Sequence, residues 1–313
     1  MREACPTAAS LPYVGTRNVR LEGAIVSADG EHAPAAPADI DLDRPSTARI
    51  YDWYLGGTSN YAVDRHFGEL ADKQFPLIKP LAMSNRQWLG RVVRAALDDG
   101  ITQFLDLGSG VPTAGNVHEI VRRYAPESAD ARVVYVDYEG VAVAHSELML
   151  EQQDATGWAG IVRADLREPD IVCEHETTRR LLDFTKPVCV LMVSVLHFVG
   201  GADNVPRVID RYRRRIAPGS WLAASHITTD DAPAGGAAQI SALAESYRNT
   251  QNPAWLRDRA EFTSWFGEFD LVEPGVVHLT DWRPDHPDTL FPELEPAAVR
   301  PFYWAGVGRV RER

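Results

Sequence analysis

The chain has 313 residues, which is enough for one large α/β domain with additions. Its 32 basic and 44 acidic side chains give a formal net charge of −12, which argues against a protein that binds nucleic acid through a basic face. The three cysteines lack metal-ligand spacing and support neither a disulfide framework nor a metal site. The longest apolar run, residues 188–199, is too short to cross a bilayer. Because no signal peptide is visible, we expect a cytoplasmic protein that makes no membrane contact.

The N-terminal third divides into an arm and a helical cap. Residues 1–42 lack periodicity and become rich in Ala and Pro, which predicts an extended or partly disordered arm. Residues 43–100 predict a cap of helices. These helices run from Ser46 as N-cap to Gly56-Gly57, from about Tyr61 toward Ala71, and from Leu81 to Asp98.

A glycine-containing turn opens the next region, residues 101–313. The stretch Phe104–Gly110 reads Phe-Leu-Asp-Leu-Gly-Ser-Gly, and a helix-like segment, residues 113–124, follows. A short apolar run, a turn and a helix are typical of the first strand, nucleotide loop and first helix of a doubly wound α/β domain. Gly108 and Gly110 allow the backbone to pass close to a ligand.

The same loop bears on which of two cofactors is bound, the dinucleotide NAD or S-adenosylmethionine. A dinucleotide loop has the pattern G-x-G-x-x-G, but Thr113 stands where the third glycine should be. Asp106 is poorly placed beside a diphosphate and well placed to receive an ammonium group or, through water, a sugar hydroxyl. S-adenosylmethionine (SAM) carries an α-amino group and a ribose but no phosphate. The loop therefore favours SAM over NAD.

Three further apolar runs predict the next strands, and each ends in a polar residue: residues 131–136 before Asp137, residues 160–164 before Asp165, and residues 188–196 before His197. An acid at the end of the second strand is where a ribose diol is held. Asp165 is placed to accept a hydrogen bond from an adenine amino group. Each acid alone could cap a helix or lie solvated in a loop. Together with Asp106 at the first strand, Asp137 and Asp165 make acids at three successive strand ends, in the order a nucleotide would meet them, and this favours a nucleotide site.

The C-terminal part predicts the remainder of a Rossmann-like sheet. The expected elements are a helix over residues 204–215, a strand over 220–225, a helical insertion around 230–266, and two antiparallel strands over 269–279 and 301–310. Pro274-Gly275 interrupts the first of these two strands with a bulge or turn. Such a terminal hairpin separates class I methyltransferases from ordinary nicotinamide dehydrogenases.

Several segments together resemble the actinobacterial family of SAM-dependent methyltransferases that was long catalogued as a domain of unknown function. The segment over residues 48–65, with its YDWYLGGTSNYAVDR signature, is the most specific; the others cover residues 104–119, 134–137 and 194–198. The resemblance extends from about Pro45 to the C-terminus. It implies SAM as cofactor and a class I methyltransferase fold of the α/β class: a seven-stranded, mostly parallel sheet with a terminal antiparallel hairpin. It implies no substrate.

Cofactor-binding residues are expected in the cap and at the strand ends. Tyr51 to Arg65 could fold over the methionine end of SAM, with Asp64 or Arg65 pairing its zwitterion; the alternative is a helix–turn–helix with Gly56-Gly57 as an ordinary C-cap. The expected cofactor residues are Tyr51, Gly56, Gly57, Asn60, Tyr61, Arg65, Asp106, Gly108, Gly110, Thr113, Asp137, Tyr138, Asp165, Leu166 and Ser194.

Two histidines are the candidate catalytic residues. Val195-Leu196-His197 is similar to the segment around the base histidine of small-molecule O-methyltransferases, and an imidazole can take a hydroxyl proton near neutral pH. The alternative for His197 is a packed, structural histidine. His226, after the fifth strand, is the second candidate. Aromatic residues of the cap and the late region could form an acceptor pocket: Trp53, Tyr54, Trp255, Trp265, Trp282 and Tyr303.

The sequence thus predicts an enzyme that transfers a methyl group from SAM to a small aromatic or heteroaromatic metabolite in secondary metabolism. The methylated atom, O, N or activated C, is left open, and so is a homodimer. The motif Asn/Asp-Pro-Pro-Tyr, typical of nucleobase amino methylation, is absent after the fourth strand. The alternatives are a non-catalytic SAM-binding regulatory protein and an NAD-dependent oxidoreductase.

Overall fold

The structure is a computed structural model that describes residues 41, 43–125, 129–284, 291, 294 and 296–312. The chain divides into Met1–Ala36 and Pro37–Arg313, and every element below belongs to the second unit. The predicted arm, residues 1–42, lies outside the described residues except for Asp41.

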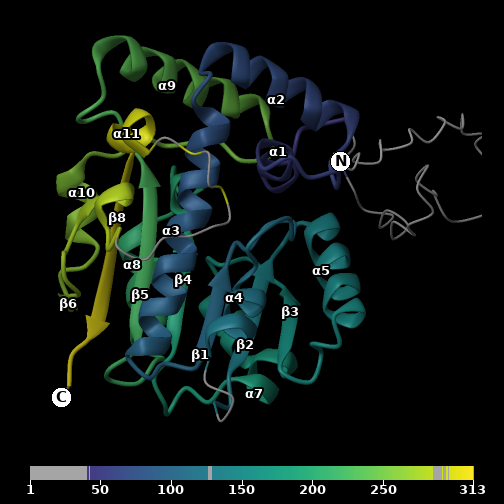
Figure 1. The fold of residues 1–313 in the computed structure, drawn as a ribbon, viewed down its shortest axis with the longest axis vertical. Helices are drawn as coiled ribbons and strands as arrows, with labels where there is room; N and C mark the ends of the chain where they lie inside the picture. Colours follow the sequence, from purple (N-terminus) through teal and green to yellow (C-terminus); the bar gives the residue numbers. More distant parts are fainter. Residues whose placement is uncertain are drawn as a thin grey trace, which may run out of the picture. The chain divides into compact units, whose positions relative to one another are not determined.

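One mixed sheet forms the centre of this unit (Figure 1). Its order within the described chain is β3-β2-β1-β4-β5-β8-β6, and β7 pairs with β8. The pairs among β1 to β5 are parallel, whereas β8 runs antiparallel to β5, β6 and β7. The strands are β1 Gln103–Leu107, β2 Arg132–Asp137, β3 Ala159–Arg163, β4 Cys189–Val193, β5 Trp221–Ile227, β6 Phe269–Leu271, β7 Val277–His278 and β8 Tyr303–Val310.

The predicted fold class, with its mostly parallel sheet and terminal hairpin, is confirmed. The sheet has eight strands rather than seven within the described residues, because the predicted strand over 269–279 is divided into β6 and β7. The interruption falls at Pro274-Gly275, as the sequence predicts, and Gly275 takes a positive φ of 84° there.

Helices cover both faces of the sheet and its carboxyl edge (Figure 1). The α-helices are α1 Thr47–Tyr54, α2 Ala62–Gln74, α3 Ile78–Asp98, α4 Val117–Tyr124, α5 Gly140–Gln152, α6 Pro169–Glu174, α7 Glu176–Leu181, α8 Val205–Arg213, α9 Ala234–Ser246, α10 Arg259–Ser264 and α11 Pro296–Val299. Short 3₁₀ helices are η1 Leu196–Phe198, η2 Tyr247–Asn249, η3 Leu279–Asp281 and η4 Arg300–Phe302.

Alternation along the strands separates two hydrophobic cores. Phe104 of β1 belongs to the core that also holds buried side chains of α3 and α4, whereas the adjacent Leu105 belongs to the core on the opposite face, with α6, α7 and α8. The same alternation occurs in β2, β4 and β5, because successive side chains of a strand point to opposite faces. Burial on both faces is typical of parallel strands and explains their continuous apolar sequences.

Helix α3 departs from the predicted cap. It begins at Ile78, three residues earlier than expected, and its later turns pack against α4, β4 and β5 through residues such as Val92 and Ala96. The layer above the carboxyl edge of the sheet therefore consists of α1, α2 and α9, together with the first turns of α3 (Figure 1).

Two further predicted boundaries shift. Helix α4 begins at Val117 rather than Thr113, because Asn116 and Glu119 form a reciprocal capping box at its N-terminus. Strand β5 continues to Ile227, so His226 lies inside the strand and not after it.

Among the described residues, no helix has both the length and the apolarity to span a membrane.

Candidate active site

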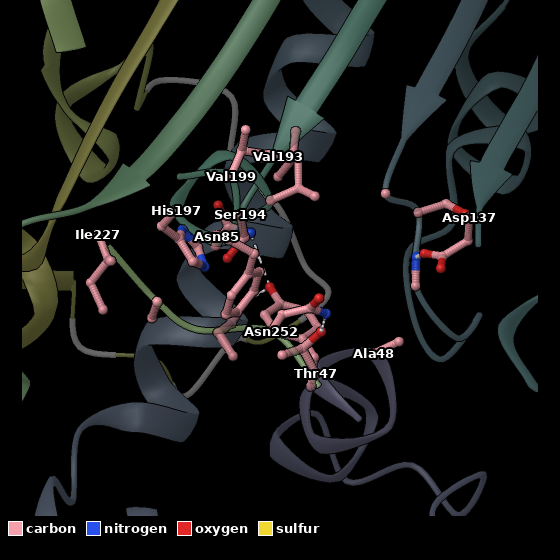
Figure 2. Close-up of a pocket in the computed structure, with 18 of the residues that line it drawn as sticks. Thr47, Ala48, Asn85, Asp137, Val193, Ser194, His197, Val199, Ile227 and Asn252 are labelled. Atoms are coloured by element: carbon pink, nitrogen blue, oxygen red, sulfur yellow. Dashed lines mark hydrogen bonds between the residues drawn. The ribbon is translucent and has the colours of Figure 1, made fainter. Parts of the chain in front are cut away.

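A large cavity lies where the parallel strands end (Figure 2). It encloses ≈ 1490 Å³ of space, a figure that includes open solvent at its mouth. Residues from the carboxyl ends of β1 to β5 and from the start of β8 line it. In a doubly wound sheet, this edge is where ligands bind.

The first turns of α3 form one wall of the cavity. Ile78, Leu81, Ala82, Asn85 and Leu89 line it, and their spacing of three and four residues places them on one helix face. A second wall comes from α9 and η2 through Ile240, Leu243 and Tyr247. Figure 2 shows Asp137 on one side of the cavity and His197 with Ile227 on the other. The sequence predicts a cofactor at Asp137 and an acceptor at His197, so we call the two sides the cofactor half and the acceptor half.

The glycine loop forms the floor of the cofactor half. Gly108 and Gly110 have positive φ values of 70° and 67°, which side-chain-bearing residues rarely adopt. A Cβ on Gly108 would lie 2.3 Å from Val195 Cγ2, whereas a Cβ on Gly110 would meet nothing within 4 Å. Gly108 is therefore needed for packing against the loop after β4, and Gly110 leaves the cavity open.

Asp137 connects the second strand to this loop. Its carboxylate accepts hydrogen bonds from the backbone N–H of Gly110 at 2.8 Å and of Glu139 at 2.9 Å. Burial raises the pKa of Asp137 to about 6, although these backbone donors oppose the shift. Asp137 lines the cavity at the end of β2, the predicted position for a ribose-binding acid.

Asp106 and Arg86 lie deeper in the cofactor half. Burial raises the pKa of Asp106 to about 7, and the nearby Arg86 charge opposes this shift. Within the described residues, the buried Nε of Arg86 and the buried Oγ of Ser109 have no hydrogen-bond partner. All three residues also line a small side cavity of ≈ 210 Å³. Buried polar atoms without partners are costly unless a ligand or water meets them.

The outer rim is formed by residues after β2 and β3. Tyr138 and Leu166 line the cavity, as predicted for cofactor contacts. Burial would raise the pKa of Asp165, but hydrogen bonds from Arg167 lower it, so the carboxyl is held as an ion pair. Asn252 reaches this rim and donates to Thr47 Oγ1 at 3.0 Å and to Tyr138 Oη.

The glycine-rich turn after α1 has a different position from the one expected. Gly56, Gly57, Asn60, Tyr61, Arg65 and Thr113 do not line the cavity. Buried Asp52 instead accepts hydrogen bonds from Thr113 Oγ1 at 2.6 Å and from Asn60 Nδ2 at 2.7 Å. A Cβ on Gly57 would lie 1.9 Å from Asp52 Oδ1. This turn therefore ties the cap to the glycine loop from a position outside the cavity lining.

Asp64 and Arg65, which the sequence predicts to pair with a zwitterion, have protein partners. The fully buried Asp64 carboxylate accepts from Arg49 Nε at 2.7 Å and from the backbone N–H of Ser46 and Tyr61. Arg49 also pairs with Glu139 at 2.9 Å, and Arg65 donates to Asn60. These partners hold α1, α2 and the N-terminus of α5 together and leave Asp64 no position for a ligand.

The acceptor half is lined by apolar and aromatic side chains with a connected set of hydroxyl groups. Ser194, which takes a positive φ of 57°, contacts Tyr303 Oη at 2.6 Å through its Oγ. Asn85 accepts from Ser225 and donates to Tyr51 Oη at 2.9 Å. The aromatic and apolar lining consists of Tyr51, Tyr54, Phe198, Val199, Ile227, Ile240, Leu243, Tyr247, Leu256 and Tyr303.

The two candidate histidines have different surroundings. His197 lines the cavity, its Nδ1 lacks a hydrogen-bond partner, and burial together with the Arg257 charge lowers its pKa to about 3. His226 lies behind it, outside the cavity lining, between the carbonyl of Ile227 and Nη1 of Arg257. Burial lowers the pKa of His226 well below its usual range. Both rings are therefore neutral near pH 7, and neither is a strong base.

Several lining residues were not predicted from the sequence. Asn85, Arg86, Glu139, Tyr247 and Asn252 all line the cavity. Asn85 and Arg86 lie on the otherwise apolar face of α3, and polar residues within an apolar stripe are the signal that could have identified them. Of the six predicted pocket aromatics, Tyr54 and Tyr303 line the cavity, whereas Trp265 packs on His226 and Trp282 packs on Trp88.

Comparisons with known proteins agree with this geometry. Residues 33–311 match the family model described as S-adenosyl methyltransferase. A crystal structure of a candidate methyltransferase from Thermobifida fusca YX is 37% identical, with a TM-score of 0.76 over 88% of this chain and 98% of that one. A DUF574 family protein from Streptomyces avermitilis is 32% identical, with a TM-score of 0.76 over 86% and 99%. A search of curated proteins gave no match. The chain therefore belongs to the S-adenosyl methyltransferase family and is a SAM-dependent methyltransferase.

Proposed function

We propose that the enzyme methylates a small, uncharged aromatic or heteroaromatic acceptor that is bound in the acceptor half. The observation that carries this proposal is the distribution of charge in the cavity. Every charged side chain among its lining residues belongs to α3, to β1 and β2, or to the segments after β2 and β3. Within the described chain, the walls contributed by β4, β5, β8 and α9 present only neutral side chains. A charged acceptor would lose its hydration there without gaining a partner.

The residues of the cofactor half fit SAM. Asp137 lies at the end of β2, where its carboxylate can accept from a ribose diol; the open backbone at Gly110 allows close approach; and Tyr138 and Leu166 offer apolar surface to an adenine. The bound cofactor supplies a methyl group on a sulfonium, which already carries its own activation. The protein must then align the acceptor with that methyl group and exclude water.

The residues of the acceptor half would perform that alignment. Tyr51 and Tyr303 are held by Asn85 and Ser194, so their rings form a fixed surface for an aromatic acceptor. His197 can hydrogen-bond to the acceptor through a neutral imidazole, but its pKa of about 3 makes it a poor proton acceptor. This environment favours a nucleophilic atom that needs no strong base, such as a neutral amine nitrogen or an acidic phenol. We infer a role in secondary metabolism from the same lining, because its neutral, aromatic-rich walls suit a small uncharged metabolite.

An acceptor screen tests the proposal. Purified enzyme is incubated with SAM and a panel of phenols and nitrogen heteroaromatics, each paired with its carboxylated or phosphorylated derivative, and release of S-adenosylhomocysteine (SAH) is measured. We expect turnover only with uncharged members. Leu243→Glu places a charge in the α9 wall and should abolish turnover while SAH binding remains; the matched control is Leu70→Glu on the exposed face of α2, where Leu70 is 51% exposed. Faster turnover of the carboxylated or phosphorylated derivatives would refute the proposal of an uncharged acceptor.

A further inference from the structure

We infer that Arg86 and Ser109 form the site for the carboxylate of the methionine moiety of SAM, beside Asp106, which the sequence predicts to receive its ammonium group. This inference rests on the family's cofactor and not on the acceptor proposed above, so the two can fail independently. It moves the recognition of the amino acid from the cap, where Asp64 and Arg65 were expected to provide it, to α3 and the glycine loop.

Arg86 is a buried cation that forms no hydrogen bond or ion pair with the described residues. Its side chain comes from α3, it is 6% exposed, and its Nε donates to no protein atom. Tyr51 lies beside it, with the guanidinium carbon 6.0 Å from the ring centroid. By contrast, the fully buried Arg49 is paired with two carboxylates. An arginine that is desolvated without an anion is costly, and a carboxylate ligand would restore the missing interactions.

Ser109 provides a second unpartnered group at the same place. Its Oγ is buried and makes no hydrogen bond. Arg86 and Ser109 both line the main cavity and the small side cavity. A hydroxyl and a guanidinium that converge on one small space form a donor set for an anionic oxygen group.

Asp106 determines which anion fits. Asp106 is 4% exposed as a residue, its carboxylate has no hydrogen-bond donor within the described chain, and it lines both spaces. A phosphate or diphosphate would be repelled by this acid. An α-amino acid carries a carboxylate and an ammonium group on adjacent atoms, and it alone satisfies the cation and the acid together. The arrangement thus excludes a dinucleotide on grounds of charge and favours the zwitterionic end of SAM.

Ligands that lack one or both of these groups separate the two roles. Calorimetry with the purified chain compares SAM, decarboxylated SAM, which lacks only the carboxylate, and methylthioadenosine, which lacks both groups. We expect the wild-type protein to bind SAM at least about tenfold more tightly than decarboxylated SAM. Arg86→Met should bind both with equal affinity, while its affinity for methylthioadenosine stays that of the wild type. Asp106→Asn should weaken SAM and decarboxylated SAM alike.

Controls keep this test decisive. Arg94→Met changes an arginine of the same helix outside the cavity lining and should leave all three affinities unchanged. Unchanged methylthioadenosine binding shows that the variant site is folded. If Arg86→Met does not fold, Arg86→Lys is measured with the same ligands and should lose part of the preference for SAM over decarboxylated SAM. The inference is overturned if the Arg86 variant retains the wild-type preference, or if it weakens methylthioadenosine by the same factor as SAM.

Discussion

At the residue scale, two buried carboxyls, Asp106 and Asp137, determine how the cavity responds to pH. Burial raises the pKa of Asp106 to about 7 and that of Asp137 to about 6. Near pH 5 these groups are protonated in the folded protein and ionised in the unfolded chain. The stability they contribute is therefore present below about pH 4 and is lost as the pH rises toward 7. A ligand that requires the ionised form of Asp106 and Asp137 will bind more tightly as the pH rises over the same range.

This linkage gives a prediction for cofactor binding. The affinity for SAH should rise between pH 5.5 and 7.5, by at most about tenfold per pH unit for each carboxyl that must ionise. Asp106→Asn should make the dependence shallower, because one titrating group is removed. Calorimetry in two buffers of different ionisation enthalpy measures both the affinity and the protons released. A flat profile in the wild-type protein would contradict the role of Asp106.

Asp137→Asn tests the ribose site. The amide keeps the size of the side chain but offers one acceptor oxygen instead of two, so it cannot serve both the backbone donors and a ribose diol. A charge-assisted hydrogen bond contributes about 1.5–3 kcal/mol, so we expect the Kd for SAM to increase by roughly 10- to 150-fold. Asp98→Asn, at an exposed position of α3, is the control. Calorimetric affinity equal to that of the wild type would remove Asp137 from the site.

The low pKa of His197 predicts how the methylation rate depends on pH. With an accepted substrate, the rate between pH 5.5 and 8 should show no inflection from this residue, because its pKa lies near 3. His197→Gln should raise the KM for the acceptor and leave the shape of the pH–rate profile and SAH binding unchanged. A loss of rate in the wild-type enzyme as the pH falls through 6.5, absent from the variant, would show instead that His197 is the general base.

The residues that the sequence located are those at strand ends. Asp106, Asp137, Asp165 and Ser194 line the cavity because the carboxyl ends of parallel strands meet at one edge, and a strand ending can be read from a short apolar run. The glycine-rich turn could not be placed in the same way. Its Gly and Asn residues are explained by contacts to Asp52, and nothing in the local sequence distinguishes a turn packed on a carboxylate from one packed on a ligand.

At the element scale, α3 has two functions along one helix. Its first turns line the cavity and its later turns pack on the sheet, so the position of Arg86 is fixed by the same apolar face that forms the core. A continuous apolar stripe does not show where it leaves the sheet and enters a cavity. This is why the helix could be predicted from the sequence while its contribution to the site could not.

The junction of α1, α2 and α5 depends on one buried ion cluster. Arg49→Met would leave the carboxylates of Asp64 and Glu139 buried without their cation. We expect a loss of about 3–5 kcal/mol in the free energy of unfolding, the usual cost of breaking a buried pair. Lys79→Met, which removes a half-exposed pair with Asp72, should cost about 0–1 kcal/mol. Urea denaturation measures both, and equal small losses would show that the cluster does not stabilise the cap.

At the scale of the whole molecule, the chain divides at residue 36. The sequence predicts that the arm is dispensable, and the structure sets the limit of the deletion, because the Asp41 carbonyl accepts from Arg49. Deletion of residues 1–36 should leave SAH affinity unchanged. Deletion through Asn60 removes Arg49 and Asp52 and should abolish binding. Calorimetry on both truncated proteins tests this, and equal affinities would show that the cap does not support the cofactor half.

The arrangement of the two halves explains how one cavity can serve methyl transfer. Charge is confined to the side where the cofactor's zwitterion and ribose are expected, and hydroxyl-bearing aromatic residues line the side where the acceptor is expected. The fold class and the cofactor could be read from the strand–loop–helix pattern and its resemblance to a known family. The acceptor could not, because its walls come from α3, α9 and β8, which are far apart in the sequence.

A crystal structure of the full chain with SAH tests this account most directly. We expect the ligand's carboxylate on Arg86 and Ser109, its ammonium group on Asp106, its ribose on Asp137, and its sulfur facing the space bounded by Tyr51, Ser194 and Tyr303. Electron density that places the ligand's amino acid end on the turn at Gly57–Arg65, or that places its nucleoside in the acceptor half, would contradict the assignment of the two halves.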